Sequence, residues 1–116
     1  MHKNSYNKVV LVGHLGGDPT GRYTKSGRST ATFSLATNES WKQQNGQIVD
    51  HTEWHALVAW DRLADFANEY LYKGQLVSVE GSLRTRSWEA QDGANRKTTE
   101  IVCSNIIPLE WKTKEK

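Results

Sequence analysis

The feature that most constrains the fold is an alternation of apolar and hydroxyl side chains within residues 29–37, which is unbroken from Thr30 to Leu35. Two sets of side chains alternate there: Ala31, Phe33 and Leu35 against Thr30, Thr32 and Ser34. Successive side chains of a β-strand point to opposite faces, so this pattern predicts a strand with one face buried and the other in solvent. Most of the remaining chain carries strand signals too, which predicts an all-β framework.

Strands and turns alternate along the rest of the chain. Further strands are expected at residues 7–15, 22–25, 49–60, 75–88 and 97–107. The polar stretch 42–47 contains Asn45-Gly46, a dipeptide favoured in tight hairpin turns, and residues 90–96 are expected to form a second loop.

In residues 61–72 the spacing of apolar side chains changes from the two-residue period of a strand. Apolar side chains recur there every three or four residues, which predicts an amphipathic helix of about three turns: Leu63, Phe66, Ala67, Tyr70 and Leu71. Asp61 is expected to be the N-cap, and Lys73-Gly74 to supply the basic last turn and the stop.

The order of elements is three strand regions, one helix and two further strand regions. This order predicts an all-β, five-stranded Greek-key barrel of the OB-fold type, with one α-helix between strands 3 and 4. An SH3-like small barrel is the alternative, although it does not normally carry a three-turn helix at that point. OB-folds commonly bind oligonucleotides or oligosaccharides. We expect residues 1–107 to form this domain and residues 108–116 to be a short, flexible C-terminal tail.

Composition excludes several other classes of protein. The 116 residues suit a single domain. The mean hydropathy is −0.71 and no apolar run approaches the roughly 20 residues that span a bilayer, so a membrane protein is not expected. One cysteine excludes an internal disulfide framework and a multi-thiolate zinc site. Residues 1–7 contain no secretory or organellar signal, so we expect a cytoplasmic protein.

The tryptophans and arginines carry most of the functional information. Five tryptophans are more than a core of this size can easily hide. Trp54 and Trp60 share parity on one expected strand and stand about 20 Å apart along it. Trp41 lies where a strand enters the polar hairpin loop.

A second stripe lies on the strand that begins at residue 75. One face of this strand is expected in solvent and presents Ser82, Arg84, Arg86 and Trp88. The opposite face is expected to be the core face and presents Val77, Val79, Gly81 and Leu83. Two guanidinium groups and an indole therefore share one exposed stripe.

Single-stranded nucleic acid is the ligand that suits interleaved cations and exposed indoles. Its unstacked bases stack on aromatic rings at about 1–3 kcal/mol each, and its phosphates bind lysine and arginine. For any one tryptophan, packing in the core or on an edge strand is an equal interpretation. Four tryptophans lie at strand positions, and two arginines share a face with one of them. For this set as a whole, the binding interpretation is stronger.

The longer motifs resemble those of bacterial single-stranded DNA-binding proteins. The resemblance rests on NKVVLVGHLG at residues 7–16, TEWH at residues 52–55 and VEGSLRTRSW at residues 79–88. It covers about residues 6 to 107, in order and without large gaps.

The resemblance implies sequence-independent binding and protection of single-stranded DNA in replication, recombination and repair. It implies four base-stacking residues, namely Trp41, Trp54, Trp60 and Trp88. It assigns phosphate contacts to Lys8, Arg22, Lys42, Arg62, Lys73, Arg84 and Arg86. It also implies a homotetramer, with Val10 in the first-strand region and His55 at subunit interfaces.

Catalytic and metal chemistry find no support in the sequence. His51 and His55 would stand about 13 Å apart along a strand, too far for one metal ion. Cys103 lies in an apolar strand and is expected to be a small core residue. No lysine-containing phosphate loop and no carboxylate pair placed for nuclease chemistry occur, so we expect no enzyme, no cofactor and no metal.

Two alternatives remain open: a primosomal or RNA-binding OB-fold module, and a protein-interaction subunit that uses its tryptophan face. Contacts with replication and repair proteins are left open as well. Relatives of the resembled family usually carry an acidic tip after a long linker, whereas the last six residues here are net basic.

Overall fold

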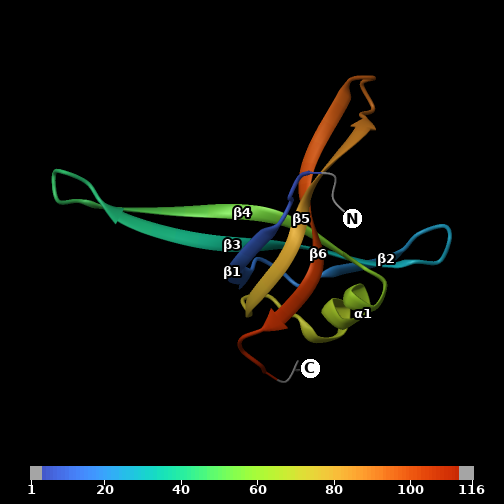
Figure 1. The fold of residues 1–116 in the computed structure, drawn as a ribbon, viewed down its shortest axis with the longest axis horizontal. Coiled ribbons are helices and arrows are strands. Elements are labelled where there is room, and N and C mark those ends of the chain that lie inside the picture. The colour runs from blue at the N-terminus through green and yellow to red at the C-terminus, as the bar shows by residue number, and fades with distance from the viewer. Residues whose placement is uncertain (1–3, 113–116) are drawn as a thin grey trace.

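The computed structural model describes residues 4–112. Over this range the chain forms one helix and six strands, and the strands join in a single sheet (Figure 1). The elements are β1 (Val9–Leu15), β2 (Thr20–Tyr23), β3 (Ser29–Lys42), β4 (Ile48–Trp60), α1 (Asp61–Tyr70), β5 (Leu76–Glu89) and β6 (Asn95–Pro108). The strand order in the sheet is β1-β5-β6-β4-β3-β2.

The sheet closes into a barrel because β1 pairs with β3 as well as with β5. At the closure His14 lies opposite Ala36, and Leu15 lies opposite Leu35. The backbones approach closely there, since a Cβ added at Gly13 would clash with the carbonyl oxygen of Ala36. Five strands make the closed barrel and β2 is an edge strand on β3. The expected five-stranded OB-type barrel, with its helix after the third barrel strand, is confirmed.

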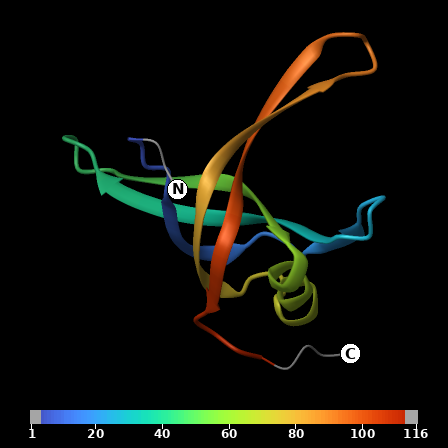
Figure 2. The same cartoon turned by 45° about the vertical axis from the view of Figure 1, so that its right-hand side comes forward.

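Two hairpins project from the barrel as long arms, one made by β3 and β4 and the other by β5 and β6 (Figures 1 and 2). Strand β3 continues to Lys42, beyond the end expected at residue 37. The turn after it contains Gly46 at a φ of +87°, as the Asn45-Gly46 signal predicts. The short strand β2 ends at Tyr23, earlier than expected.

The helix differs from expectation at both ends. It ends at Tyr70, two residues early, and Lys73 lies beyond it. The expected N-cap is wrong: Trp60 is the cap residue and no side chain caps the helix. Asp61 instead has a φ of +58° and its carboxylate accepts hydrogen bonds from Arg28. A tertiary ion pair thus takes the carboxylate that a local cap would have used.

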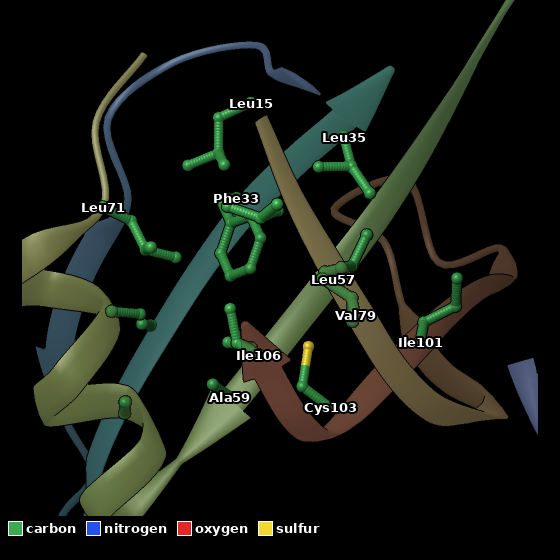
Figure 3. Packing of buried hydrophobic residues seen from close by; sticks show 14 residues of the cluster. Leu15, Phe33, Leu35, Leu57, Ala59, Leu71, Val79, Ile101, Cys103 and Ile106 are labelled. Carbon is green, nitrogen blue, oxygen red and sulfur yellow. The ribbon is translucent and has the colours of Figure 1, made fainter. Parts of the chain in front are cut away.

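The core fills the barrel and the space between the barrel and α1 (Figure 3). Leu35, Val77 and Val79 are almost completely buried, and Ala64 and Ala67 of α1 face them from the helix. The predicted burial of Ala31, Phe33 and Leu35 and of Cys103 is confirmed. Burial raises the pKa of the Cys103 thiol to about 12, so the thiol stays protonated at neutral pH and acts as an apolar core group.

Leu83 is the exception among the expected core residues, because half of its surface is exposed. It keeps the parity of Val79 and Gly81 and lies opposite Ile101, but β5 has left the barrel at this point. The register shifts between Glu80 and Gly81, where the β5–β6 arm begins to diverge. Parity alone therefore placed Leu83 on the correct face, but the described residues cover only half of its surface.

The segment after β6 is held against the barrel. The buried Gln75 side chain donates to the carbonyl of Glu110, and the Trp111 ring lies edge-on to the rings of Phe66 and Tyr70. These contacts lie within residues 108–116, whose flexibility stays a prediction, and residues 113–116 fall outside the described residues. Within residues 4–112, no helix is long and apolar enough to cross a membrane.

Candidate nucleic-acid interface

A groove lies where the two arms leave the barrel. It is lined by Gly17 of the β1–β2 loop, Ser34 and Ala56 of the β3–β4 pair, and Arg86 and Thr98 of the β5–β6 pair. Its walls thus come from five parts of the chain, namely the β1–β2 region and the strands β3, β4, β5 and β6. The groove is open to solvent, and Phe33, Leu57 and Glu100 also line it.

Trp54 stands beside this groove. It lies opposite Ala36 and has the parity of Ala56, which lines the groove. More than half of the indole surface (58%) is exposed. The indole rests on the β1–β2 loop, since a Cβ added at Gly16 would lie 2.6 Å from its Cζ3 atom. Gly16 therefore gives the ring a flat support and leaves its remaining surface free.

The arginine–tryptophan stripe of β5 faces the same groove. The register pairs Arg86 with Thr98 and Trp88 with Arg96, so the predicted shared face is confirmed by the backbone pairing. The indole N–H of Trp88 donates to the Thr98 hydroxyl at 3.1 Å. This bond fixes the ring next to a residue that lines the groove, and 43% of the Trp88 surface remains exposed.

The groove also contains negative charge. The Arg86 Nε atom lies 3.7 Å from Oε1 of Glu100, whose side chain is only 19% exposed. Asp18 accepts a hydrogen bond from the backbone N–H of Lys73 at 2.8 Å. The Glu100 carboxylate therefore offsets part of the positive charge of Arg86 in the absence of a bound phosphate.

Trp60 lies at the end of β4 on the same face as Trp54. The Arg28 guanidinium covers one side of its ring at 4.4 Å from the centroid. The carboxylate of Asp61 holds that guanidinium with two hydrogen bonds of 2.8 and 3.1 Å. These bonds lower the pKa of Asp61, so it is ionised at neutral pH. Sequence reasoning missed Arg28, because only the β3–β4 register brings it next to Trp60.

The structure separates Trp41 from the other three tryptophans. Trp41 lies opposite Val49 near the tip of the β3–β4 arm, with the parity of Leu35, so it projects from the opposite face of the arm to Trp54. It is exposed. An extended polymer bound to both Trp41 and Trp54 would have to pass around the arm.

The predicted phosphate-contacting residues do not all gather at the groove. Arg84 shares the face of Arg86, and Arg22 lies opposite Thr30 on the face that carries Trp60. The other four are exposed but line no part of the groove: Lys8, Lys42, Arg62 and Lys73. Lys8 also lies 3.9 Å from a carboxylate oxygen of Glu80.

The two predicted interface residues lie on different faces of the sheet. Val10 points outward from β1 beside Val12, and both side chains are more than half exposed. His55 of β4 has the opposite parity, next to Leu35, and its Nε2 atom lies 3.0 Å from the Thr37 hydroxyl.

His51 is hydrogen-bonded to a carboxylate of its own strand. Nε2 of His51 lies 3.0 Å from a carboxylate oxygen of Glu53, and this hydrogen bond lowers the pKa of Glu53. Across the part of the chain that the structure describes, no three metal-binding side chains of the His, Cys, Asp or Glu type come together.

A model of the single-strand binding protein family matches residues 6–109. The chain belongs to this family. Single-stranded DNA-binding protein 1 of Chlorobaculum tepidum is a family relative, 50% identical over 104 residues, which is 89% of this chain and 64% of that protein. The chain thus spans less than two thirds of that relative's length.

Two solved structures of the family are similar in fold. The Plasmodium falciparum SSB complex with ssDNA has a TM-score of 0.83 and 38% identity, covering 95% of this chain and all of that one. A deletion mutant of the single-stranded DNA binding protein from Thermus aquaticus has a TM-score of 0.79 and 31% identity, covering 90% of this chain and 51% of that one. The family architecture therefore extends over nearly the whole of this chain.

Proposed function

We propose that this chain binds single-stranded DNA without sequence preference, and that it protects the strand during replication, recombination and repair. The observation that carries the proposal is the open groove with Trp54 on one side and the Arg86–Trp88 stripe on the other. The Plasmodium falciparum relative, solved as a complex with ssDNA, supports it. The role is binding rather than catalysis, and it places the protein with DNA in the cytoplasm.

The chemistry of the groove explains sequence tolerance. Every base has a π-face, so stacking on Trp54 and Trp88 stabilises any base by about 1–3 kcal/mol. The guanidinium groups of Arg84 and Arg86 can contact phosphates, which carry no sequence information. None of these side chains has to read the hydrogen-bonding edge of a base.

We further propose that Trp41 and Trp60 extend the path beyond the groove. Trp60 continues the face of Trp54 along β4, and Arg22 lies two strands away on that same face. Trp41 would bind the single-stranded DNA after the DNA passes around the β3–β4 arm. The exposed cations Lys8, Lys42, Arg62 and Lys73 are the further candidates for phosphate contacts along such a path.

A titration with oligonucleotides of equal length tests the proposal. We expect dT, dA and mixed-sequence DNA to quench tryptophan fluorescence, with affinities that differ by less than about 3 kcal/mol. The affinity should fall steeply as salt rises, because phosphate binding releases counterions. Binding that ignored salt would indicate a protein partner instead, and clearly tighter binding of rU than of dT would indicate an RNA-binding module.

We also propose that the chain assembles as a homotetramer. Val10 and Val12 form an outward apolar row on β1, and Ile107 is exposed on the same outer face, across β5. Exposed β-branched side chains on a sheet face suit association with an identical sheet through a two-fold axis. His55 would lie at a second contact between subunits, on the opposite face.

A further inference from the structure

Trp60 differs from the other candidate stacking residues because a cation covers one of its faces. The Arg28 guanidinium lies over the ring at 4.4 Å from the centroid, a distance typical of cation–π contact. No such cation is recorded on Trp41, Trp54 or Trp88 among the described residues. One face of the Trp60 ring is therefore covered before DNA binds, and the residue is half-buried, so any stacking surface is confined to the rest of the ring.

The guanidinium is held in place from two directions. Asp61 binds it with two parallel hydrogen bonds, from Nε to Oδ1 at 3.1 Å and from Nη2 to Oδ2 at 2.8 Å. The backbone of Arg28 is tied to Thr24, whose hydroxyl accepts from the Arg28 N–H and whose N–H donates to the Arg28 carbonyl. The fork geometry and the closed turn together restrict the side chain to the Trp60 ring.

Asp61 takes an unusual backbone conformation to make this contact. Its φ of +58° is uncommon for a residue with a side chain, and it directly follows Trp60 at the start of α1. The conformation costs energy and the carboxylate caps no helix N–H, so the bonds to Arg28 are the stabilising contacts that the structure gives it.

From this arrangement we propose that Arg28, held by Asp61, is a positioning residue for DNA binding that fixes the Trp60 ring so that a base stacks on its uncovered face. The inference rests on the proposed single-stranded DNA binding. In this arrangement Arg28 stays on the ring in the complex, and the bound base, the indole and the guanidinium form one continuous stack. Its charge is matched by Asp61, so it does not serve as a phosphate contact.

Arg28→Ala is the central test, with Lys25→Ala as the matched control because Lys25 is an exposed cation in the same β2–β3 turn, whereas Arg28 is the cation placed over Trp60. Arg28→Ala should weaken binding of a dT oligomer about two- to five-fold and leave the salt slope unchanged. In a Trp60→Ala background the same substitution should have no effect, since Arg28 acts through the ring. Thermal melting of each variant shows whether it is folded.

Nuclear magnetic resonance of the Arg28 side chain gives a second readout. Ring-current shifts of its side-chain protons should be present in the free protein, absent in Trp60→Ala, and retained when dT oligomer is added. Loss of these shifts on DNA addition, or a salt slope lowered by about 0.7 in Arg28→Ala, would overturn the proposal in favour of a direct phosphate contact.

Failure of this inference is distinguishable from failure of the proposed function. If the unmodified protein does not bind dT oligomers, the proposed function itself is wrong. If the unmodified protein binds, and Arg28→Ala and Lys25→Ala both bind equally well, then only the positioning role of Arg28 is wrong.

Discussion

At the scale of single residues, the proposed binding groove would combine two kinds of contact with different physics. Trp54 and Trp88 offer π-faces, which release no counterions when a base stacks on them. Arg84 and Arg86 offer charge, which exchanges bound counterions for phosphate. Glu100 modifies the second kind, because its partly buried carboxylate faces Arg86. Substitutions at these positions should therefore separate by their response to salt.

Replacing one tryptophan should lower affinity without changing the salt slope. For Trp54→Ala or Trp88→Ala we expect a loss of about 1–3 kcal/mol of binding free energy.

Replacing an arginine should instead change the response to salt. For Arg84→Ala we expect the slope of log K against log salt to fall by about 0.7, the value for one single-strand phosphate contact. Fluorescence titrations at four salt concentrations measure both quantities. Normal binding by folded tryptophan variants would show that these indoles are packing residues.

Removing the acid that faces Arg86 should have the opposite effect. Glu100→Gln keeps the shape of the side chain but frees the guanidinium and removes a charge that repels phosphate. We expect DNA to bind about two- to five-fold more tightly at low salt, with a gain that shrinks as salt screens the groove. Glu89→Gln, on the opposite face of the arm, is the control. An unchanged affinity for Glu100→Gln would mean that Arg86 makes no phosphate contact.

At the scale of secondary-structure elements, barrel closure places the proposed binding residues. The pairing of β1 with β3 brings the β1–β2 loop beside the β3–β4 arm, so Gly16 can support Trp54. The β4–β6 contact is short and parallel, with Leu57 opposite Ile101 and Val58 opposite Val102. Beyond it the β3–β4 and β5–β6 arms separate (Figure 2). The groove exists because the two long hairpins diverge from a closed barrel.

A side chain at the closure should destabilise the barrel. Gly13→Ala would place a methyl group against the carbonyl of Ala36, and such overpacking typically costs about 1–3 kcal/mol. Gly17→Ala is the matched control, since a Cβ there meets no atom within 4 Å. Thermal or denaturant unfolding should show a loss for Gly13→Ala that clearly exceeds the loss for the control. Equal stability of the two variants would contradict a tight closure.

At the scale of the whole molecule, two surfaces are free for two kinds of partner. The groove side carries the indoles and arginines, whereas the outer face of β1 carries exposed valines. Because these surfaces are distinct, assembly through β1 would leave the grooves open to DNA. A homotetramer built in this way would present several grooves to one long strand, which strengthens binding by raising effective concentration.

Light scattering tests the assembly directly. We expect a particle of about four times the 13.2 kDa chain mass at micromolar concentration. Val10→Asp should give a smaller particle, because a carboxylate would be desolvated at the interface. A stable species of about 13 kDa for the unmodified chain would contradict the proposal.

The sequence by itself determined the features that depend on neighbours in the chain. Period-two alternation identified the buried face of residues 29–37, and period-3.6 spacing identified the helix after Trp60. Parity likewise placed Arg86 and Trp88 on one face of a strand. These inferences hold because strand and helix geometry make side-chain direction a property of local sequence.

Only the tertiary structure decided which of these faces meet. It exposed Leu83 where β5 leaves the barrel, placed Trp41 on the far side of its arm, and put Arg28 over Trp60. It also took Asp61 away from its expected capping role. Barrel closure and strand register join residues far apart in sequence, so no local period can reveal these contacts.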